Sequence, residues 1–173
     1  MIPDFLNPKQ TIDALSFLKE NMIACDIGSG SGGWTIPLAK KLENGKVYAV
    51  DIKEEALSAL RSKLDSERIY NVELILADIE KGVKIQDNKV DLVIISNILF
   101  ELNDKKKTLE EIKRILKEEG YLFIIDWKKL GNVGPKDHAI SRDEMKEMAS
   151  ELNLKLEQDF DLGHYHWALI FRK

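Results

Sequence analysis

Four glycines lie close together after a short apolar run at residues 22–27, which we expect to form a strand. Glycine adopts positive φ without strain and lets a ligand approach the backbone closely. Ligands of parallel sheets bind at the carboxyl ends of the strands, where this loop lies. A plain turn between a strand and a helix needs only one or two glycines, so the loop predicts a binding site. Its sequence is Asp26-Ile27-Gly28-Ser29-Gly30-Ser31-Gly32-Gly33.

The glycine spacing alone leaves two ligands open. Gly28-x-Gly30-x-x-Gly33 satisfies the dinucleotide fingerprint, and a similar loop binds S-adenosylmethionine. Asp26 favours the second ligand, because a carboxylate would repel a pyrophosphate but suits the ammonium of a methionine moiety. The chain also has no Tyr followed by Lys four residues later, the signature of short-chain dehydrogenases, and it ends in a hairpin foreign to an ordinary dehydrogenase domain.

Three polar residues each follow another expected strand, and so would face the same crevice as the loop. Asp51 is placed to accept hydrogen bonds from both ribose hydroxyls of a nucleoside. Asp78 can accept from an adenine amine, and Asn97 would lie at the end of the fourth strand. Each residue also fits a helix cap or a turn, and that alternative stays open.

These residues depend on a regular alternation of short apolar runs with amphipathic stretches of helical period through residue 126. This alternation predicts a parallel sheet with helices on both faces. The last two strands are joined by too few residues for a crossover helix, so they must be antiparallel. We expect strands at 22–27, 46–51, 72–77, 90–96, 121–125, 154–160 and 165–171, and helices starting at Asn7-Pro8 and covering about 33–42, 53–66, 104–117 and 141–152.

The bulk composition predicts one globular domain over residues 1–173, with 44% hydrophobic and 32% charged residues. The net charge of −4 disfavours a nucleic-acid partner. The single cysteine, Cys25, suits a reducing cytoplasm. No apolar run approaches the roughly 20 residues that span a bilayer, and no signal peptide is evident, so we expect a cytoplasmic protein without a membrane partner. Nothing in the sequence supports a particular oligomer.

The motifs together resemble those of class I S-adenosylmethionine-dependent methyltransferases. The resemblance covers about residues 8–126 and is nearest to the small-molecule branch that includes the ubiquinone- and menaquinone-biosynthesis methyltransferases. It implies an α/β fold with a single Rossmann-like, doubly wound sheet of seven strands in the order 3-2-1-4-5-7-6, strand 7 antiparallel. It is carried by Asp26-x-Gly28-x-Gly30-x-Gly32, Asp51, Ala77-Asp78, Val90-Asp91-Leu92-Val93, Asn97-Ile98-Leu99-Phe100-Glu101 and the stretch 112–121.

The same resemblance implies S-adenosylmethionine as cofactor and assigns roles to individual residues. The glycines would line its methionine end, Asp51 would bind the ribose and Asp78 the adenine amine. Ile52 and Ile79 would pack on the adenine faces, although both also fit as plain core residues. No metal is expected. The predicted cofactor-binding residues are Asp26, Gly28, Ser29, Gly30, Gly32, Asp51, Ile52, Asp78, Ile79 and Asn97.

Departures from the family pattern limit the classes of acceptor that the resemblance implies. The branch often has His where Phe100 stands. Adenine- and glutamine-methylating relatives carry two prolines after the residue that matches Asn97, and this chain carries none there. The single Cys25 excludes the multi-cysteine pattern of arsenic methylation.

The acceptor site is predicted from topology. Residues 1–21 would form an N-terminal helical cap, and residues 127–173 would contribute a loop, a helix and the hairpin to the acceptor site. The hairpin turn lies at the same edge as the cofactor, and His is the side chain best suited to proton transfer near neutral pH. The alternative to a catalytic role is that His164 and His166 are simply exposed at the hairpin and that Tyr165 packs on a helix. The candidate catalytic residues are His166, Tyr165 and His138, with His164 beside them.

The sequence therefore predicts transfer of a methyl group from S-adenosylmethionine to an unidentified small molecule by direct in-line displacement. Three alternatives stay open: a cofactor-binding module without turnover of its own, a protein or RNA methyltransferase, and a nicotinamide oxidoreductase.

Overall fold

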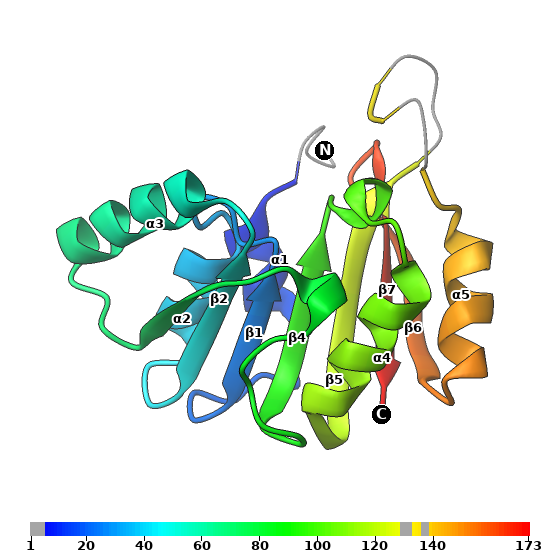
Figure 1. The fold of residues 1–173 in the computed structure, drawn as a ribbon, viewed down its shortest axis with the longest axis horizontal. Coiled ribbons are helices and arrows are strands. Elements are labelled where there is room, and N and C mark those ends of the chain that lie inside the picture. Colours follow the sequence, from blue (N-terminus) through cyan, green and yellow to red (C-terminus); the bar gives the residue numbers. More distant parts are fainter. Residues whose placement is uncertain (1–5, 129–132, 136–138) are drawn as a thin grey trace.

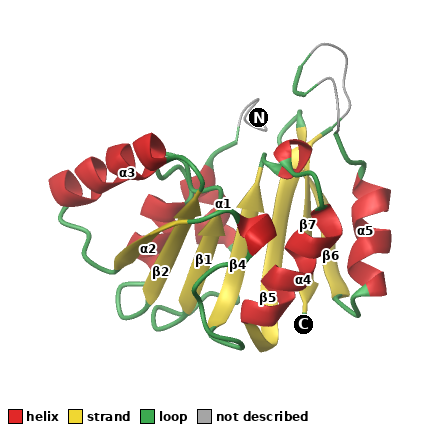
Figure 2. Cartoon of the chain, in the orientation of Figure 1, coloured by secondary structure: helices red, strands yellow, loops and turns green. Residues whose placement is uncertain are grey.

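The chain folds around one twisted sheet of seven strands with helices on both faces (Figures 1 and 2). The computed structural model describes residues 6–128, 133–135 and 139–173. The strand order is β3-β2-β1-β4-β5-β7-β6. The strands are β1 (Ile23–Ile27), β2 (Lys46–Asp51), β3 (Val72–Leu76), β4 (Val90–Ser96), β5 (Leu116–Trp127), β6 (Lys155–Leu162) and β7 (His166–Arg172).

The predicted topology is confirmed. Strands β1 to β5 pair in parallel, and β7 runs antiparallel to both of its neighbours, β5 and β6. Because β6 is antiparallel to β7, it runs in the direction of β1 to β5. The carboxyl ends of these six strands and the start of β7 therefore lie at one edge of the sheet, called the carboxyl edge below.

The helices divide between the two faces of the sheet. Helices α1 (Pro8–Ala14), α2 (Thr35–Lys41) and α3 (Glu54–Glu67) pack on one face, called the α1 face. Helices α4 (Lys105–Ile115) and α5 (Arg142–Glu151) pack on the other, called the α4 face. Two short 3-10 turns, η1 (Ile79–Lys81) and η2 (Leu99–Glu101), follow β3 and β4.

The central strands are buried on both faces, which explains their nearly continuous apolar sequences. In β4, Leu92 and Ile94 belong to the apolar cluster under α1 and α2. Val93 and Ile95 belong to the cluster under α4 and α5. The sheet itself is thus the wall between two cores.

Two predicted helix starts are confirmed in atomic detail. The Asn7 side chain accepts a hydrogen bond from the Gln10 amide, with Pro8 in the first turn. Ser141 and Glu144 form a reciprocal capping box at the start of α5. Helix α1 nevertheless ends at Ala14, earlier than its apolar stripe implied, although Leu15 and Leu18 are still buried beyond it.

The start of the fifth strand was predicted wrongly. Helix α4 ends at Ile115 and β5 begins at Leu116, so Gly120 lies inside the strand and does not stop a helix. Leu116 pairs with Val90, whereas Tyr121 pairs with Leu92, and the intervening residues form an irregularity in the register. The local pattern favoured helix, but pairing with β4 determined the structure.

The C-terminal hairpin is present, with shifted bounds. Strand β6 continues to Leu162 and β7 begins at His166, so the turn consists of residues 163–165. Gly163 adopts φ 69°, which glycine tolerates without strain. The turn lies at the carboxyl edge, as the topology required.

Asn71 connects the edge of the sheet to the helix that follows the glycine loop. Its side-chain amide donates to the carbonyls of Ala39 and Leu42, at 2.9 and 2.8 Å, where α2 ends. We expect Asn71→Ala to lower the free energy of unfolding by about 1–3 kcal/mol, because two carbonyls lose their donor. Urea titration measures this change in the free energy of unfolding. Asn44→Ala is the matched control, since the Asn44 side chain makes no hydrogen bond among the described residues and should change stability by less than about 0.5 kcal/mol. Equal losses in both variants would contradict this assignment.

Candidate active site

The glycine loop after β1 takes a conformation that requires glycine. Gly28, Gly30 and Gly32 adopt φ of 72°, 51° and 97°. A Cβ on Gly28 would lie 2.8 Å from the side chain of Ile98, and one on Gly32 would lie 2.5 Å from Leu60. A Cβ on Gly30 would meet nothing within 4 Å. Gly28 and Gly32 are thus fixed by packing, whereas Gly30 borders open space.

Asp51 links the loop to the end of β2. One carboxylate oxygen accepts from the Gly30 amide at 2.7 Å, and the other accepts from the Lys53 amide at 2.9 Å. An ionised carboxylate offers about four acceptor positions, so each oxygen can take a further hydrogen bond. Asp51 therefore both shapes the loop and remains able to bind a hydroxyl.

A cavity of about 500 Å³ opens beside this loop. Six of the predicted cofactor residues line it, namely Gly28, Gly30, Asp51, Ile52, Asp78 and Ile79. Ile52 is 62% exposed and presents apolar surface to the cavity. Four other predicted residues, Asp26, Ser29, Gly32 and Asn97, lie outside the lining that the described residues form.

The other residues of the cavity wall were not among the predicted cofactor-binding residues. They are Ile27, Val50, Lys53, Ala56, Ala77, Glu80, Ile98, Glu101, Leu102 and Asn103. Five of these lie within two residues of a predicted acid, and that proximity was the available signal; they are Ile27, Val50, Lys53, Ala77 and Glu80. Ala56 comes from α3, and the remaining four residues come from η2 and the residues that flank it, whose approach to β1 is a tertiary feature.

Asp78 occupies the end of β3 as predicted, and it also caps η1. Its carboxylate accepts from the Glu80 amide at 3.0 Å and pairs with Lys81 at 3.0 Å. The hydrogen bond from Lys81 lowers the pKa of this carboxyl. Asp78 is therefore an ionised acceptor at the cavity, and the cap alternative also holds.

Asp26 is buried beneath the loop and is 1% exposed. Its carboxylate accepts from the Thr35 hydroxyl at 2.6 Å. Burial raises the pKa of Asp26 to about 6, and the hydrogen bond from Thr35 opposes that shift. Asp26 is thus a negative charge held under the glycines near neutral pH, and contact with a ligand ammonium stays a prediction.

A second buried carboxylate, Asp126, lies at the end of β5 and was not predicted. It is 2% exposed and accepts from the amides of Leu99 and Trp127, at 3.2 and 2.7 Å. Burial raises the pKa of Asp126 to about 6. The carboxylate holds η2, and with it part of the cavity wall, against β5. An acid at the end of a doubly buried strand was the overlooked signal.

The histidines of the hairpin differ in their surroundings. His164 is exposed and contacts the Tyr165 ring at 4.8 Å, whereas His166 is 3% exposed and packs on Trp127 at 4.2 Å. Burial, and then the charge of Lys128, lowers the pKa of His166 to about 4. His166 is therefore neutral near physiological pH, because the strand buries the ring, and its part in catalysis stays a prediction. His138 lies outside the described residues.

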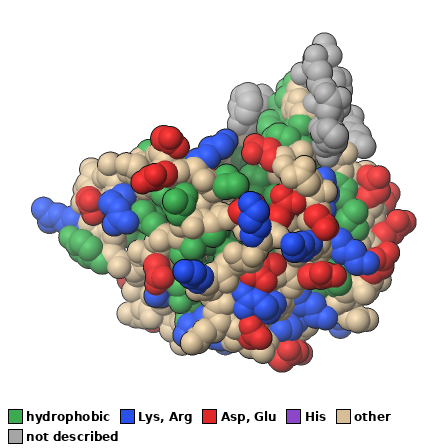
Figure 3. Space-filling view, viewed as in Figure 1, with side chains coloured by type: hydrophobic (Ala, Val, Ile, Leu, Met, Phe, Trp, Pro, Cys, Tyr) green, Lys and Arg blue, Asp and Glu red, His purple; other side chains and the backbone are tan. Residues whose placement is uncertain are grey.

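The part of the chain that the structure describes contains neither a metal site nor a membrane-spanning helix. Within residues 6–128, 133–135 and 139–173, no group of three or more His, Cys, Asp or Glu side chains is placed to hold a metal ion. No helix in these ranges is long and apolar enough to cross a membrane. On the face shown in Figure 3, acidic and basic side chains are interspersed, without a continuous basic patch among the described residues.

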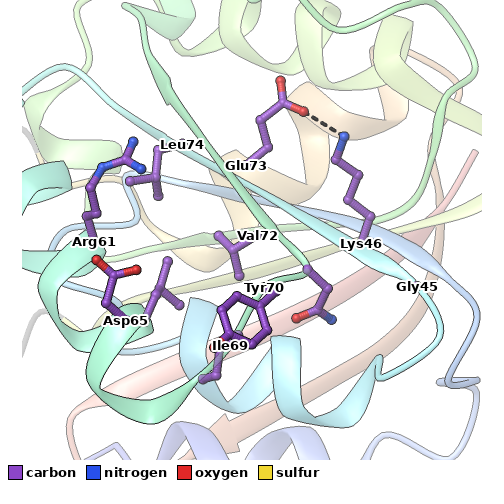
Figure 4. A pocket seen from close by; sticks show the side chains of 11 residues that line it. Gly45, Lys46, Arg61, Asp65, Ile69, Tyr70, Val72, Glu73 and Leu74 are labelled. Atoms are coloured by element: carbon purple, nitrogen blue, oxygen red, sulfur yellow. Dashed lines mark ion pairs between the residues drawn. The ribbon is translucent and has the colours of Figure 1, made fainter.

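A further hollow of about 620 Å³ lies between α3 and the outer edge of the sheet (Figure 4). Lys46 and Glu73 form an ion pair at its border, 2.6 Å apart. None of the predicted site residues lines it, and it lies away from the carboxyl ends of the central strands. It is therefore a groove beside an edge strand and not part of the candidate site.

Comparison with known proteins identifies relatives of the whole sheet. A family model described as a methyltransferase domain matches residues 18–168. The ubiquinone/menaquinone biosynthesis C-methyltransferase UbiE of Hydrogenovibrio crunogenus is 34% identical over 118 residues, which are 67% of this chain and 46% of that protein. The ribosomal protein L11 methyltransferase of Dictyoglomus thermophilum is 37% identical over 107 residues, 60% of this chain and 32% of that protein. The chain thus spans about half the length of the UbiE relatives.

Solved structures match over nearly the whole chain. A SAM-dependent methyltransferase from Aquifex aeolicus superimposes with a TM-score of 0.88 at 28% identity, covering 98% of this chain and 90% of that one. A putative type 11 methyltransferase from Sulfolobus solfataricus gives 0.77 at 29% identity, covering 97% and 92%. The fold is therefore shared with a SAM-dependent methyltransferase and a putative methyltransferase.

The buried Asp26 makes stability depend on pH. Its folded-state pKa of about 6 lies above the ordinary value of 3.8, so the folded protein binds this proton more tightly than the unfolded chain does. The resulting stability is fully present below about pH 4 and is lost as the pH rises through about 6. Two pKa units correspond to about 3 kcal/mol. We expect the wild type to lose about that much relative to Asp26→Asn between pH 4 and pH 7 in urea titrations. A difference in the free energy of unfolding that stays constant between pH 4 and pH 7 would contradict this prediction.

Proposed function

The chain belongs to the methyltransferase domain family, and on that premise we propose that it transfers a methyl group from S-adenosylmethionine to a small-molecule acceptor by direct in-line displacement. The observation that carries the proposal is the cavity beside Gly30, where open space, an acceptor carboxylate and an exposed apolar side chain occur together. Each of these three features fits a different part of the cofactor.

The fit can be followed along the cavity. The methionine end would lie at Gly30, where nothing occupies the place of a side chain. The ribose hydroxyls would donate to Asp51, whose oxygens keep acceptor positions free. The adenine ring would cover Ile52 and contact Ile79, and its amine would donate to Asp78. The exposure of Ile52 is then explained, because a bound ring would remove that apolar surface from water.

The protein's contribution to the reaction is binding and orientation. When bound, S-adenosylmethionine supplies a methyl group on a positively charged sulfur, which already makes the sulfur a good leaving group. The residues of the loop hold the methyl donor in one place, and the Asp26 carboxylate stabilises positive charge near it above about pH 6. Holding two reactants in line lowers the entropic part of the barrier. A general base is needed only where the acceptor atom carries a proton.

A small-molecule acceptor is supported by the UbiE relatives, whose name describes C-methylation in quinone biosynthesis. The net charge of −4 also disfavours a nucleic-acid acceptor. A protein acceptor is the competing possibility, because one relative is named for methylating a ribosomal protein.

Labelled S-adenosylmethionine separates these acceptors. The protein is incubated with methyl-labelled cofactor and, separately, with small-molecule, protein and RNA fractions of a cell extract. We expect label in the small-molecule fraction with stoichiometric release of S-adenosylhomocysteine. Label in the protein or RNA fraction would overturn the proposed acceptor class. Cofactor binding without release in any fraction would favour a module that has no turnover of its own.

Gly30→Val tests the assignment of the loop. The branched side chain would enter the space proposed for the methionine end, and at φ 51° it would also strain the loop. We expect calorimetry to detect no binding of S-adenosylmethionine while circular dichroism shows an intact fold. Gly33→Ala is the control, because an added Cβ there also meets nothing within 4 Å, at a glycine whose φ is not positive, and Gly33 does not line this cavity. Near-normal affinity in Gly30→Val would remove the loop from the site.

Asp51→Ala tests the ribose contact. Hydrogen bonds to a charged group contribute about 1.5–3 kcal/mol, so the dissociation constant for S-adenosylmethionine should rise by roughly 10- to 150-fold. Asp51→Asn keeps one acceptor oxygen and should give a smaller loss. An unchanged dissociation constant in Asp51→Ala would exclude the residue from the cofactor site.

A further inference from the structure

Several buried polar atoms near the carboxyl edge have no hydrogen-bond partner among the described residues. They include the hydroxyl oxygen of Ser96 and both ring nitrogens of His166. Ser96 is 9% exposed and His166 is 3% exposed. Buried polar groups in native proteins are almost always hydrogen-bonded, so such atoms require a water molecule or a ligand. Unpartnered groups gathered at one edge therefore indicate a place where a polar ligand binds.

These two side chains lie on the same face of the sheet. In the register, Ser96 pairs with Ile125, Ile125 with Ala168, and Trp127 with His166. Ile125 and Ala168 belong to the apolar cluster under α1 and α2. Since side chains alternate between faces, Ser96, Trp127 and His166 also point to the α1 face.

The spacing of the strands places both groups within reach of one small molecule. Strand β5 lies between β4 and β7, so Ser96 and His166 are separated by two strand spacings, about 10 Å, across the sheet and by two residues, about 7 Å, along it, which is roughly 12 Å in all. Ser96 follows Ile95, the partner of Ile27, which immediately precedes the glycine loop. A molecule lying from Ser96 to His166 therefore starts beside the proposed methyl donor.

We propose that Ser96 and His166 form the two polar ends of the acceptor site on the α1 face, and that His166 positions the acceptor through an uncharged hydroxyl group. The proposal rests on the proposed function, because it places the acceptor relative to the methyl donor. His166 is a positioning residue here and not a general base.

The chemistry of the imidazole selects an uncharged hydroxyl. With its pKa lowered to about 4, His166 is neutral near physiological pH and offers one donor and one acceptor nitrogen. A hydroxyl group can complete either kind of hydrogen bond. A charged group would instead have to lose its hydration at a buried ring, where the nearby Lys128 is already paired with Asp161 at 2.7 Å.

The test uses four small probes that share one ring: phenol, benzoate, benzylamine and toluene. Ring-nitrogen NMR of the three histidines, with His166 assigned through His166→Gln, reports on contact with each probe. We expect phenol to shift the His166 nitrogens selectively, and the charged and apolar probes to leave them unchanged. No shift with phenol at tens of millimolar, equal shifts with all four probes, or a bound water that no probe displaces would overturn the proposal.

Variants connect this contact with methyl transfer. His166→Phe should weaken phenol binding, and raise KM for an identified acceptor, by about 10-fold or more. His166→Gln, which keeps a donor and an acceptor, should recover part of the loss, and His164→Phe is the exposed control. The dissociation constant for S-adenosylmethionine should stay within about two-fold in all three, because the hairpin does not line the cofactor cavity. A parallel loss of cofactor affinity would overturn the proposal.

The two proposals can fail separately. Wild-type protein that does not bind S-adenosylmethionine contradicts the proposed function, whatever phenol does at His166. Wild-type protein that binds the cofactor, without a selective phenol shift, contradicts only the placement of the acceptor.

Discussion

The hydrogen bond from the Gly30 amide to the Asp51 carboxylate, 2.7 Å long, is the interaction on which the rest of the site depends. It ties the loop after β1 to the end of the neighbouring strand, β2. Gly28 and Gly32 are closed in by Ile98 and Leu60, so among the three positive-φ glycines of the loop only Gly30 borders open space. The same carboxylate that shapes the loop keeps acceptor positions for a ligand. The hydrogen bond that sets the local fold of the loop therefore also sets the geometry of the candidate cofactor site.

Charged side chains have different partners at the carboxyl edge and away from it. Away from the site, Arg114 pairs with Glu111 and Asp87, each at 2.6 Å, and also bonds backbone carbonyls. At the carboxyl edge, Asp26 and Asp126 are buried with raised pKa values, and each accepts hydrogen bonds but forms no ion pair among the described residues. Buried carboxylates with shifted pKa values are typical of functional sites.

The alternation of strands and helices, the antiparallel hairpin and six of the sixteen residues that line the candidate cavity followed from the sequence because their signals are local, whereas the strand order followed from the family resemblance. Glycine spacing, acids after apolar runs and hairpin length depend on neighbouring residues only. The start of β5 at Leu116 could not be predicted, since it depends on pairing with Val90. The lowered pKa of His166 and the part played by Asp126 likewise depend on burial, which a linear pattern does not contain. The roles of individual residues toward cofactor and acceptor stay predictions.

The loop at Gly28–Gly33 also satisfies a dinucleotide fingerprint, so the choice of ligand is the central claim. Isothermal titration of the wild-type protein with S-adenosylmethionine and with NAD, under identical conditions, tests it most directly. The account predicts saturable binding of one S-adenosylmethionine per chain and no detectable binding of NAD, because the Asp26 charge repels a pyrophosphate. Tighter binding of NAD than of S-adenosylmethionine would contradict it.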